Sequence, residues 1–118
     1  MREFEVRLYE DEIGNCPVEV FIHNLDAKMQ AKLIGLLDVL KEKGNNLREP
    51  YSKYLEDGIF ELRCKVGNNI TRVLYFFYYD EKIILTNGFV KKTRKTPRKE
   101  IKLAKKRRDV FVERVRIQ

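Results

Sequence analysis

The sequence predicts an α+β domain whose elements follow the order β-α-α-β-β-β-α. Three observations support this: an alternating apolar segment at the start, two helical segments before residue 45, and three consecutive segments rich in β-branched and aromatic residues between residues 59 and 89. A chain of 118 residues has the length of one domain, so we expect a single domain over residues 1–118. We expect a twisted, mainly antiparallel sheet with two N-terminal helices on one face and a C-terminal helix.

The first third of the chain predicts one strand followed by two helices. Apolar and charged side chains alternate over Phe4–Tyr9, as in a half-buried strand. Pro17–Asn24 should be a short helix with Cys16 as a weak cap, because proline is tolerated at the first helical position. A longer helix should begin after Asp26, its cap, and end at Gly44. Apolar residues at helical spacing support it: Met29, Leu33, Leu36, Leu37 and Leu40.

Three consecutive strands should follow a polar connection over Asn45–Asp57. They are expected at Ile59–Val66, Ile70–Tyr79 and Lys82–Phe89. Gly67-Asn68 is typical of a two-residue hairpin turn, and Asp80-Glu81 is expected to close the second hairpin in the same way. The middle of the chain therefore predicts an antiparallel meander.

The last segment predicts a basic loop followed by a helix. The loop covers Val90–Thr96, and Thr96 is expected to cap a helix with Pro97 at its first position. One face of this helix should be apolar: Ile101, Ala104 and Phe111. The pattern over Val110–Ile117 fits either a helix or a strand.

The positive charge of the chain is concentrated at its C-terminal end. The formal net charge is +7, and residues 91–118 hold 13 basic and three acidic residues. Residues 1–90 hold 12 basic and 15 acidic residues, so the excess comes from the last segment. Concentrated positive charge attracts polyanions, of which nucleic acid is the commonest. A solvated basic helix that serves solubility is the alternative.

Composition favours a cytoplasmic protein that does not enter the membrane. No segment approaches the roughly 18 apolar residues of a membrane span, and Lys91–Lys99 has no apolar face for a membrane surface. The charged, alternating start is unlike a secretory signal peptide. Cys16 and Cys64 stand far apart without a CxxC partner, so we expect reduced thiols without a nucleophilic role.

The first hairpin is expected to place two arginines opposite each other. With Gly67-Asn68 as the turn, Arg63 pairs with Arg72. Cross-strand partners share one side of a sheet, and Glu61 shares that side because side chains alternate along a strand. Opposed like charges are unfavourable unless an anion or a carboxylate lies between them. The pattern therefore indicates an anion site.

The second hairpin extends this face. With Asp80-Glu81 as the turn, Arg72 lies beside Phe89, and Lys91 emerges on the same side. Cations beside an aromatic ring are expected where a phosphate backbone and an unstacked base are held. A surface salt bridge between Arg63 and a neighbouring carboxylate is the alternative interpretation, and a one-residue shift of the turn would separate the arginines.

Several motifs carry a resemblance to a known family. They are Tyr51-x-Lys53-x-Leu55-x-Asp57-Gly58-Ile59-Phe60-Glu61-Leu62-Arg63, Arg72-Val73-Leu74-Tyr75, Phe89-Val90-Lys91-Lys92-Thr93-Arg94-Lys95-Thr96-Pro97, and Glu100-Ile101 with Ala104. With Gly14-x-x-Pro17-Val18-x-x-Phe21 they cover nearly the whole chain. In these motifs the chain resembles the phage-derived, HigB-like branch of the RelE/ParE toxin superfamily, and the resemblance implies a RelE-like fold.

The resemblance also implies a function. It implies the toxin of a type II toxin–antitoxin system, a ribosome-dependent mRNA endonuclease in which the ribose 2′-OH attacks the adjacent phosphate without a metal or other cofactor. The implied partners are a cognate helix-turn-helix antitoxin and mRNA on the ribosome. Arg72 carries over as the phosphate-stabilising arginine. Further catalytic candidates are Arg63, Lys91, Lys92, Lys95 and Glu61. Candidate RNA contacts are Lys53, Phe89, Arg94 and Arg98.

Some positions depart from the family pattern. RelE has two lysines where Ile59 and Glu61 stand here and a tyrosine where Ile101 stands, which leaves Glu61 as a candidate base. His23, the single histidine, falls on the first expected helix, away from this face, which argues against a histidine-based mechanism. The acidic residues and this histidine form no metal-ligand pattern, so we expect no metal site. Inhibition of DNA gyrase by a ParE-like protein contact, and non-catalytic nucleic-acid binding, remain alternative functions.

Overall fold

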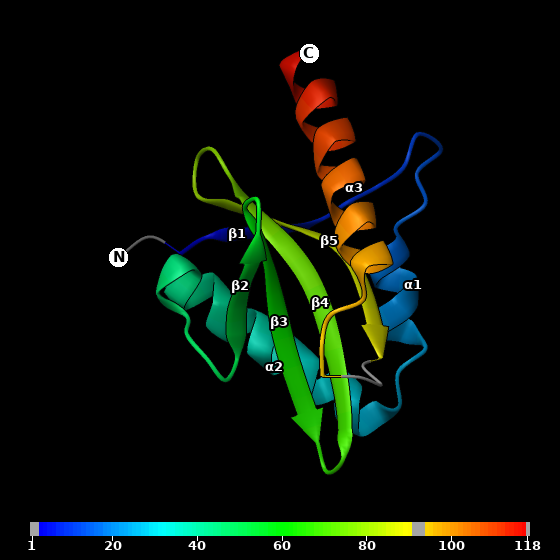
Figure 1. The fold of residues 1–118 in the computed structure, drawn as a ribbon, viewed down its shortest axis with the longest axis vertical. Coiled ribbons are helices and arrows are strands. Elements are labelled where there is room, and N and C mark those ends of the chain that lie inside the picture. Colours follow the sequence, from blue (N-terminus) through cyan, green and yellow to red (C-terminus); the bar gives the residue numbers. More distant parts are fainter. Residues whose placement is uncertain (1–2, 91–93, 118) are drawn as a thin grey trace.

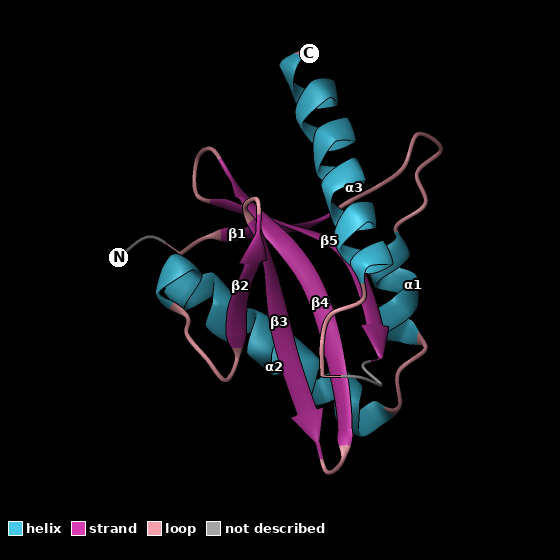
Figure 2. Ribbon diagram, in the orientation of Figure 1, coloured by secondary structure: helices cyan, strands magenta, loops and turns pink. Residues whose placement is uncertain are grey.

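The computed structural model describes residues 3–90 and 94–117. Its elements are β1 (Glu5–Leu8), α1 (Pro17–His23), α2 (Ala27–Lys43), the 3-10 turn η1 (Gly44–Asn46), β2 (Ser52–Glu56), β3 (Ile59–Val66), β4 (Asn69–Tyr78), β5 (Lys82–Val90) and α3 (Arg98–Arg116). The strands form one sheet in the order β1-β5-β4-β3-β2 (Figures 1 and 2). β1 runs parallel to β5, and the other neighbouring strands are antiparallel. The α+β class and the mainly antiparallel sheet are therefore confirmed.

The sheet is covered on both faces. α1 and α2 lie on one face and α3 crosses the other (Figure 1). The core under α1 and α2 contains Val18, Met29, Leu33, Leu40, Leu62, Cys64, Val73 and Tyr75, among others. The core under α3 is smaller and contains Tyr9, Ile59, Leu74, Phe76, Ile84 and Ala104. Alternation along the strands sends successive residues to the two cores, so each strand presents one set of side chains to α1 and α2 and the other set to α3.

The helix boundaries follow from local chemistry. Cys16 caps α1 without a side-chain hydrogen bond, as expected for a weak cap. The Asp26 carboxylate caps α2, since its Oδ1 accepts a hydrogen bond of 2.9 Å from the Met29 backbone N–H. Gly44 ends α2 with a φ of +53°, and a Cβ at this position would lie 2.0 Å from the ring of Phe4. A side chain there would thus meet both backbone strain and the ring that precedes β1.

One strand was missing from the expectation. The segment expected to be a polar connection contains β2, which pairs with β3 through Ser52–Leu62, Lys53–Glu61 and Tyr54–Phe60. The order expected from the sequence was therefore wrong here by one edge strand. β2 is short and polar, and it pairs on one side only, so its sequence lacks the apolar run that marks the central strands.

The first hairpin has the expected register. The second hairpin has a different turn, but Arg72 still pairs with Phe89 as expected. Val66 pairs with Asn69 around the Gly67-Asn68 turn. In the second hairpin Tyr78, rather than Tyr79, pairs with Lys82, so the turn holds three residues. A β-bulge at Thr86 then adds one residue to β5, and the two departures cancel.

The C-terminal segment is one continuous helix. α3 begins at Arg98, with Pro97 as its cap residue, and runs through Arg116, which resolves the ambiguous pattern over Val110–Ile117 in favour of a helix. Phe111 packs edge-on against Phe76 and Tyr78, with ring centroids 5.9 and 5.3 Å away. The expectation that Thr96 caps this helix was wrong, because its hydroxyl donates to Glu61 instead. Within the described residues, no helix is long and apolar enough to cross a membrane.

Candidate functional site

Arg63 on β3 and Arg72 on β4 are direct cross-strand partners. Both lie on the sheet face that carries α3, because their neighbours Leu62 and Val73 point into the core under α1 and α2. The opposed arginine pair expected from the hairpin register is therefore confirmed.

A buried carboxylate lies between these two guanidinium groups. The Glu61 side chain is 0% exposed, and its Oε2 accepts hydrogen bonds from Arg72 Nη1 and, at 3.1 Å, from Arg63 Nε. Its Oε1 accepts from the hydroxyl of Thr96, which ties the segment before α3 to the sheet. Arg63 Nη1 also lies 3.6 Å from Glu49 Oε1. The two guanidinium groups and the carboxylates of Glu61 and Glu49 balance formally, so the excess positive charge of the neighbouring surface comes from other basic side chains.

Arg72 is the more deeply placed of the two arginines. Its side chain is 5% exposed, against 22% for Arg63. Burial lowers the pKa of the Arg72 guanidinium from its usual value, while Glu61 opposes that shift and Arg63 adds to it. Arginine stays charged despite such shifts. Arg72 Nε is buried and has no hydrogen-bond partner among the described residues, so a donor remains for a ligand or water.

The arginine pair opens into a groove of about 1110 Å³ between the sheet and the start of α3. Among the described residues that line it, six are basic and one is acidic: Lys53, Arg63, Arg72, Arg94, Lys95 and Arg98, with Glu56. The remaining lining residues are Tyr54, Leu55, Asn68, Ile70, Thr96 and Ile101. A concave, strongly positive surface of this kind suits a polyanion.

The structure brings most of the expected site residues together. All six basic lining residues were expected from the sequence as catalytic or RNA-binding groups. Glu61 lies beneath the groove with both oxygens occupied by hydrogen bonds, so it holds the arginines rather than facing a substrate. Phe89 does pair with Arg72, but its ring is partly buried against the core under α3 and does not line the groove. Lys91 and Lys92 lie outside the described residues.

Sequence reasoning missed two polar groups of this site. The hydrogen bond from Thr96 to Glu61 spans 35 residues, and no local pattern could indicate it. Glu56 sits at the end of the unexpected strand β2, where it meets two cations of α3. Tyr54 was missed as well, although an exposed aromatic residue next to Lys53 is a recognisable signal for nucleic-acid contact.

Glu56 fastens the start of α3 to the sheet edge. Arg98 Nη2 donates to Glu56 Oε2 at 3.0 Å, and Lys105 also donates to this carboxylate. These contacts with Arg98 and then Lys105 lower the pKa of the Glu56 carboxyl to about 2, from its usual 4.5. The charge of Arg98 is thus partly neutralised by Glu56, which leaves less of it to attract a ligand.

This carboxylate predicts a pH-dependent stability. A carboxyl whose pKa is lowered by folding stabilises the folded state above its unfolded pKa, and that contribution is lost as the pH falls through the folded pKa. For Glu56 the window therefore runs from pH 4.5 down to about 2. Thermal unfolding across this window should show a steeper fall of Tm in the wild-type protein than in Glu56→Gln. Parallel curves for the two proteins would show that the contact contributes nothing.

The cysteines and the histidine lie away from the groove. Cys64 is buried in the core under α1 and α2, and burial raises the pKa of its thiol; burial also raises that of Cys16. A raised pKa disfavours the nucleophilic thiolate. His23 is exposed at the end of α1. Over residues 3–90 and 94–117, no three His, Cys, Asp or Glu side chains group as metal ligands.

Comparison with known proteins gives a family match. The model of the family described as Phage derived protein Gp49-like (DUF891) matches residues 20–109, a range from α1 into α3 that includes the whole groove. No curated protein matches the chain. The family is of the RelE/HigB-like toxin type, which confirms the resemblance at this coarser level. The assignment to the HigB branch stays a prediction.

Proposed function

We propose that this chain, which belongs to the phage-derived Gp49-like family, is the toxin of a type II toxin–antitoxin pair and cleaves mRNA on the ribosome. The observation that carries the proposal is the opposed pair Arg63 and Arg72, held by Glu61 at one side of a groove whose lining is predominantly basic. A phosphodiester placed in this groove would meet two guanidinium groups from neighbouring strands. The planar guanidinium group suits phosphate, because it can donate two parallel hydrogen bonds to a pair of phosphate oxygens.

The proposed reaction is an intramolecular transesterification. The ribose 2′-oxygen attacks the adjacent phosphorus, the bond from phosphorus to the 5′-oxygen breaks, and a 2′,3′-cyclic phosphate remains. Arg63 and Arg72 stabilise the charge that develops on the non-bridging oxygens. A lysine of the basic segment takes the proton from the 2′-OH and another group returns one to the 5′-oxygen. Lys95 lines the groove and is our candidate among the described lysines, and Glu61 is a positioning residue.

The proposed function implies partners and a compartment. A toxin of this type is held inactive by a cognate antitoxin, for which we propose a helix-turn-helix protein. The substrate is mRNA on the ribosome, so the protein would act in the cytoplasm. The charge distribution supports an RNA partner, because the basic residues of the groove would release counterions from the phosphate backbone.

One observation favours a second candidate function. The Arg72 side chain is 5% exposed and ion-paired, as expected of a structural salt bridge. A ParE-like toxin of the same fold that inhibits DNA gyrase by protein contact would need no reactive groove. This candidate predicts growth arrest with intact mRNA.

A translated message distinguishes the two candidates. Purified protein is added to a cell-free translation system with an mRNA, or with the same mRNA lacking its start codon, and the 5′ ends are mapped by primer extension. We expect cuts inside codons of the translated message only, with cyclic phosphate at the upstream ends. If the protein arrests growth when it is expressed in cells but leaves the translated mRNA intact in this assay, the nuclease proposal is wrong.

A further inference from the structure

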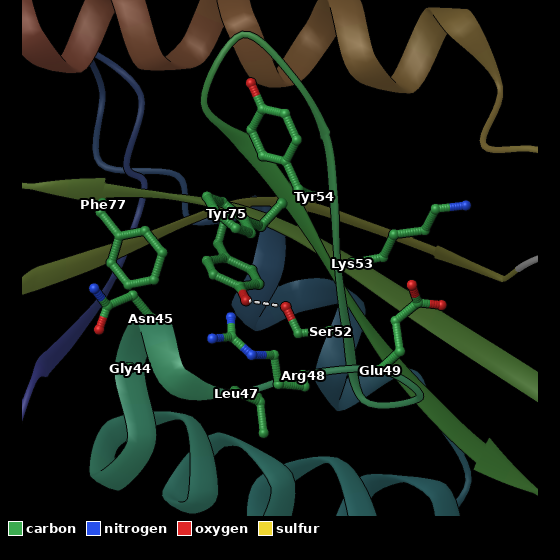
Figure 3. A pocket seen from close by; sticks show the side chains of 11 residues that line it. Gly44, Asn45, Leu47, Arg48, Glu49, Ser52, Lys53, Tyr54, Tyr75 and Phe77 are labelled. Carbon is green, nitrogen blue, oxygen red and sulfur yellow. Dashed lines mark hydrogen bonds between the residues drawn. The ribbon is translucent and has the colours of Figure 1, made fainter.

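A second pocket lies on the other side of β2, between the end of α2 and the sheet (Figure 3). Its volume is about 350 Å³, close to the lower limit of small-molecule sites. It is lined by Gly44, Asn45, Leu47, Arg48, Glu49, Ser52, Lys53, Tyr54, Phe60, Tyr75 and Phe77. The arginine pair does not line it, although Lys53 and Tyr54 line both this pocket and the groove.

Aromatic rings form the inner wall of this pocket. Phe60 stacks on Tyr75 with ring centroids 5.5 Å apart, and Phe77 meets Phe60 edge-on at 5.1 Å. Tyr54, about half exposed, packs edge-on against Phe60 at 5.1 Å and forms the outer end of the wall. Such a wall offers ring faces and edges to a planar ligand.

Two buried hydroxyl groups lie at the base of the pocket. Ser52 and Tyr75 are 4% and 1% exposed, and their hydroxyls share one hydrogen bond (Figure 3). Burial raises the pKa of the Tyr75 phenol, which keeps it protonated near neutral pH. Two hydroxyls bring two O–H donors and the shared bond uses one. One buried donor therefore remains for an acceptor on a ligand or water.

The rim of the pocket carries two basic side chains, Arg48 and Lys53. Arg48 and Lys53 have no hydrogen-bond or ion-pair partner for their charged groups within residues 3–90 and 94–117. In Figure 3 the Arg48 guanidinium points toward the hydroxyl of Tyr75. Glu49, the acidic lining residue, has a carboxylate oxygen 3.6 Å from Arg63 Nη1 of the groove. The two cations and the hydroxyl pair thus place several hydrogen-bond donors around one pocket.

The pocket and the groove share two lining residues at the sheet edge formed by β2. Lys53 and Tyr54 line both of them, and Tyr51 and Tyr54 on this edge are 52% and 54% exposed. A single-stranded RNA that leaves the groove over Lys53 would reach the pocket along the same basic and aromatic surface. This shared basic and aromatic edge favours an RNA occupant over a peptide side chain, because proteins bind single-stranded nucleic acid with cations and aromatic rings together.

We propose that this pocket is a subsite for one unpaired ribonucleotide of the RNA whose backbone lies in the groove. The base stands against the aromatic wall, its carbonyl or ring nitrogen accepts from the hydroxyl pair, and Arg48 binds the acceptor edge or the phosphate. Guanine suits these donors, because its O6 and N7 accept together from an arginine fork. The identity of the ligand as RNA rests on the proposed function, while the pocket itself does not depend on cleavage.

Guanosine 5′-monophosphate is the probe for this subsite. We expect amide resonances of Asn45, Arg48, Ser52 and Tyr75 to shift on titration of the full-length protein, followed by NMR. Arg48→Gln should raise Kd about tenfold or more, the effect of losing one charge-assisted hydrogen bond. Tyr75→Phe should also weaken binding, because the hydroxyl is lost and the ring is kept. Lys43→Gln, an exposed charge change near the same end of α2 that does not line the pocket, should leave Kd unchanged.

Several outcomes would overturn the proposal. Shifts confined to groove residues, or equal affinity in Arg48→Gln and wild type, would exclude the pocket as a nucleotide subsite. If the resonances of the pocket residues do not shift with the nucleotide but shift when the cognate antitoxin is added, the pocket is a protein-binding site instead. Nucleotide binding in the pocket without cleavage of translated mRNA would leave the subsite standing and remove the nuclease function, so the two failures are distinguishable.

Discussion

Arg63→Ala is expected to slow cleavage of translated mRNA by about 10²–10³-fold, the usual effect of removing one preorganised charge-stabilising donor. Arg63 is the more exposed partner of the pair and lines the groove, so its loss removes transition-state stabilisation with little effect on the core. The rate is measured as the appearance of primer-extension stops in a cell-free translation time course. Lys28→Ala, which removes an exposed charge from α2 on the other face of the sheet, is the matched control and should cleave at the wild-type rate.

Arg72 needs a different design, because its removal alone leaves Glu61 buried with less compensation. The double variant Glu61→Gln/Arg72→Gln replaces the ion pair by two neutral amides and avoids an unpaired buried charge. It should also lose activity by at least two orders of magnitude while its circular dichroism spectrum stays native. Wild-type rates in both this variant and Arg63→Ala, with folded protein, would remove the groove from the mechanism and favour action by protein contact.

Glu61→Ala is expected to lower the free energy of unfolding by about 3–5 kcal/mol, the range for breaking a buried ion pair on one side. The Glu61 carboxylate is fully buried and separates two guanidinium groups that would otherwise oppose each other directly across the strands. Its loss also leaves the hydroxyl of Thr96 without its acceptor. Urea unfolding followed by circular dichroism gives the value.

A second variant separates lost attraction from uncompensated charge. Glu61→Leu/Arg72→Leu removes both members of the pair, so it should be less destabilised than Glu61→Ala even though it changes more atoms. The opposite order, or a loss below about 1 kcal/mol in Glu61→Ala, would show that solvent already compensates the charge of Arg72 without Glu61. The electrostatic account of this cluster would then be wrong.

The arginine pair was predictable because its determinants are local. A two-residue turn at Gly67-Asn68 and strict alternation in the adjacent strands are enough to place Arg63 opposite Arg72. The helices were predictable for the same reason, since the Asp26 cap and the Gly44 stop act within one turn. Features encoded within about ten residues of each other were therefore accessible from the sequence.

The remaining parts of the site depend on contacts between distant segments. The bond from Thr96 to Glu61 and the clasp of Glu56 by Arg98 and Lys105 form only once α3 lies on the sheet. Periodicity does not report such pairings. Strand β2 escaped for a related reason, because an edge strand is defined by the neighbour it joins more than by its own residues.

The bulge at Thr86 determines which face of the sheet each later side chain of β5 points to. Ile84 faces the α3 side, and after the extra residue Phe89 faces that side again, whereas plain alternation would have turned its ring toward α1. Gly88 instead occupies the α1 side, where a Cβ would lie 2.4 Å from the ring of Phe21. One residue inserted or deleted between Lys82 and Thr86 would therefore turn the side chain of Phe89 to the other face of the sheet. In chains of this design, length changes in this hairpin should be tolerated in pairs and rejected singly.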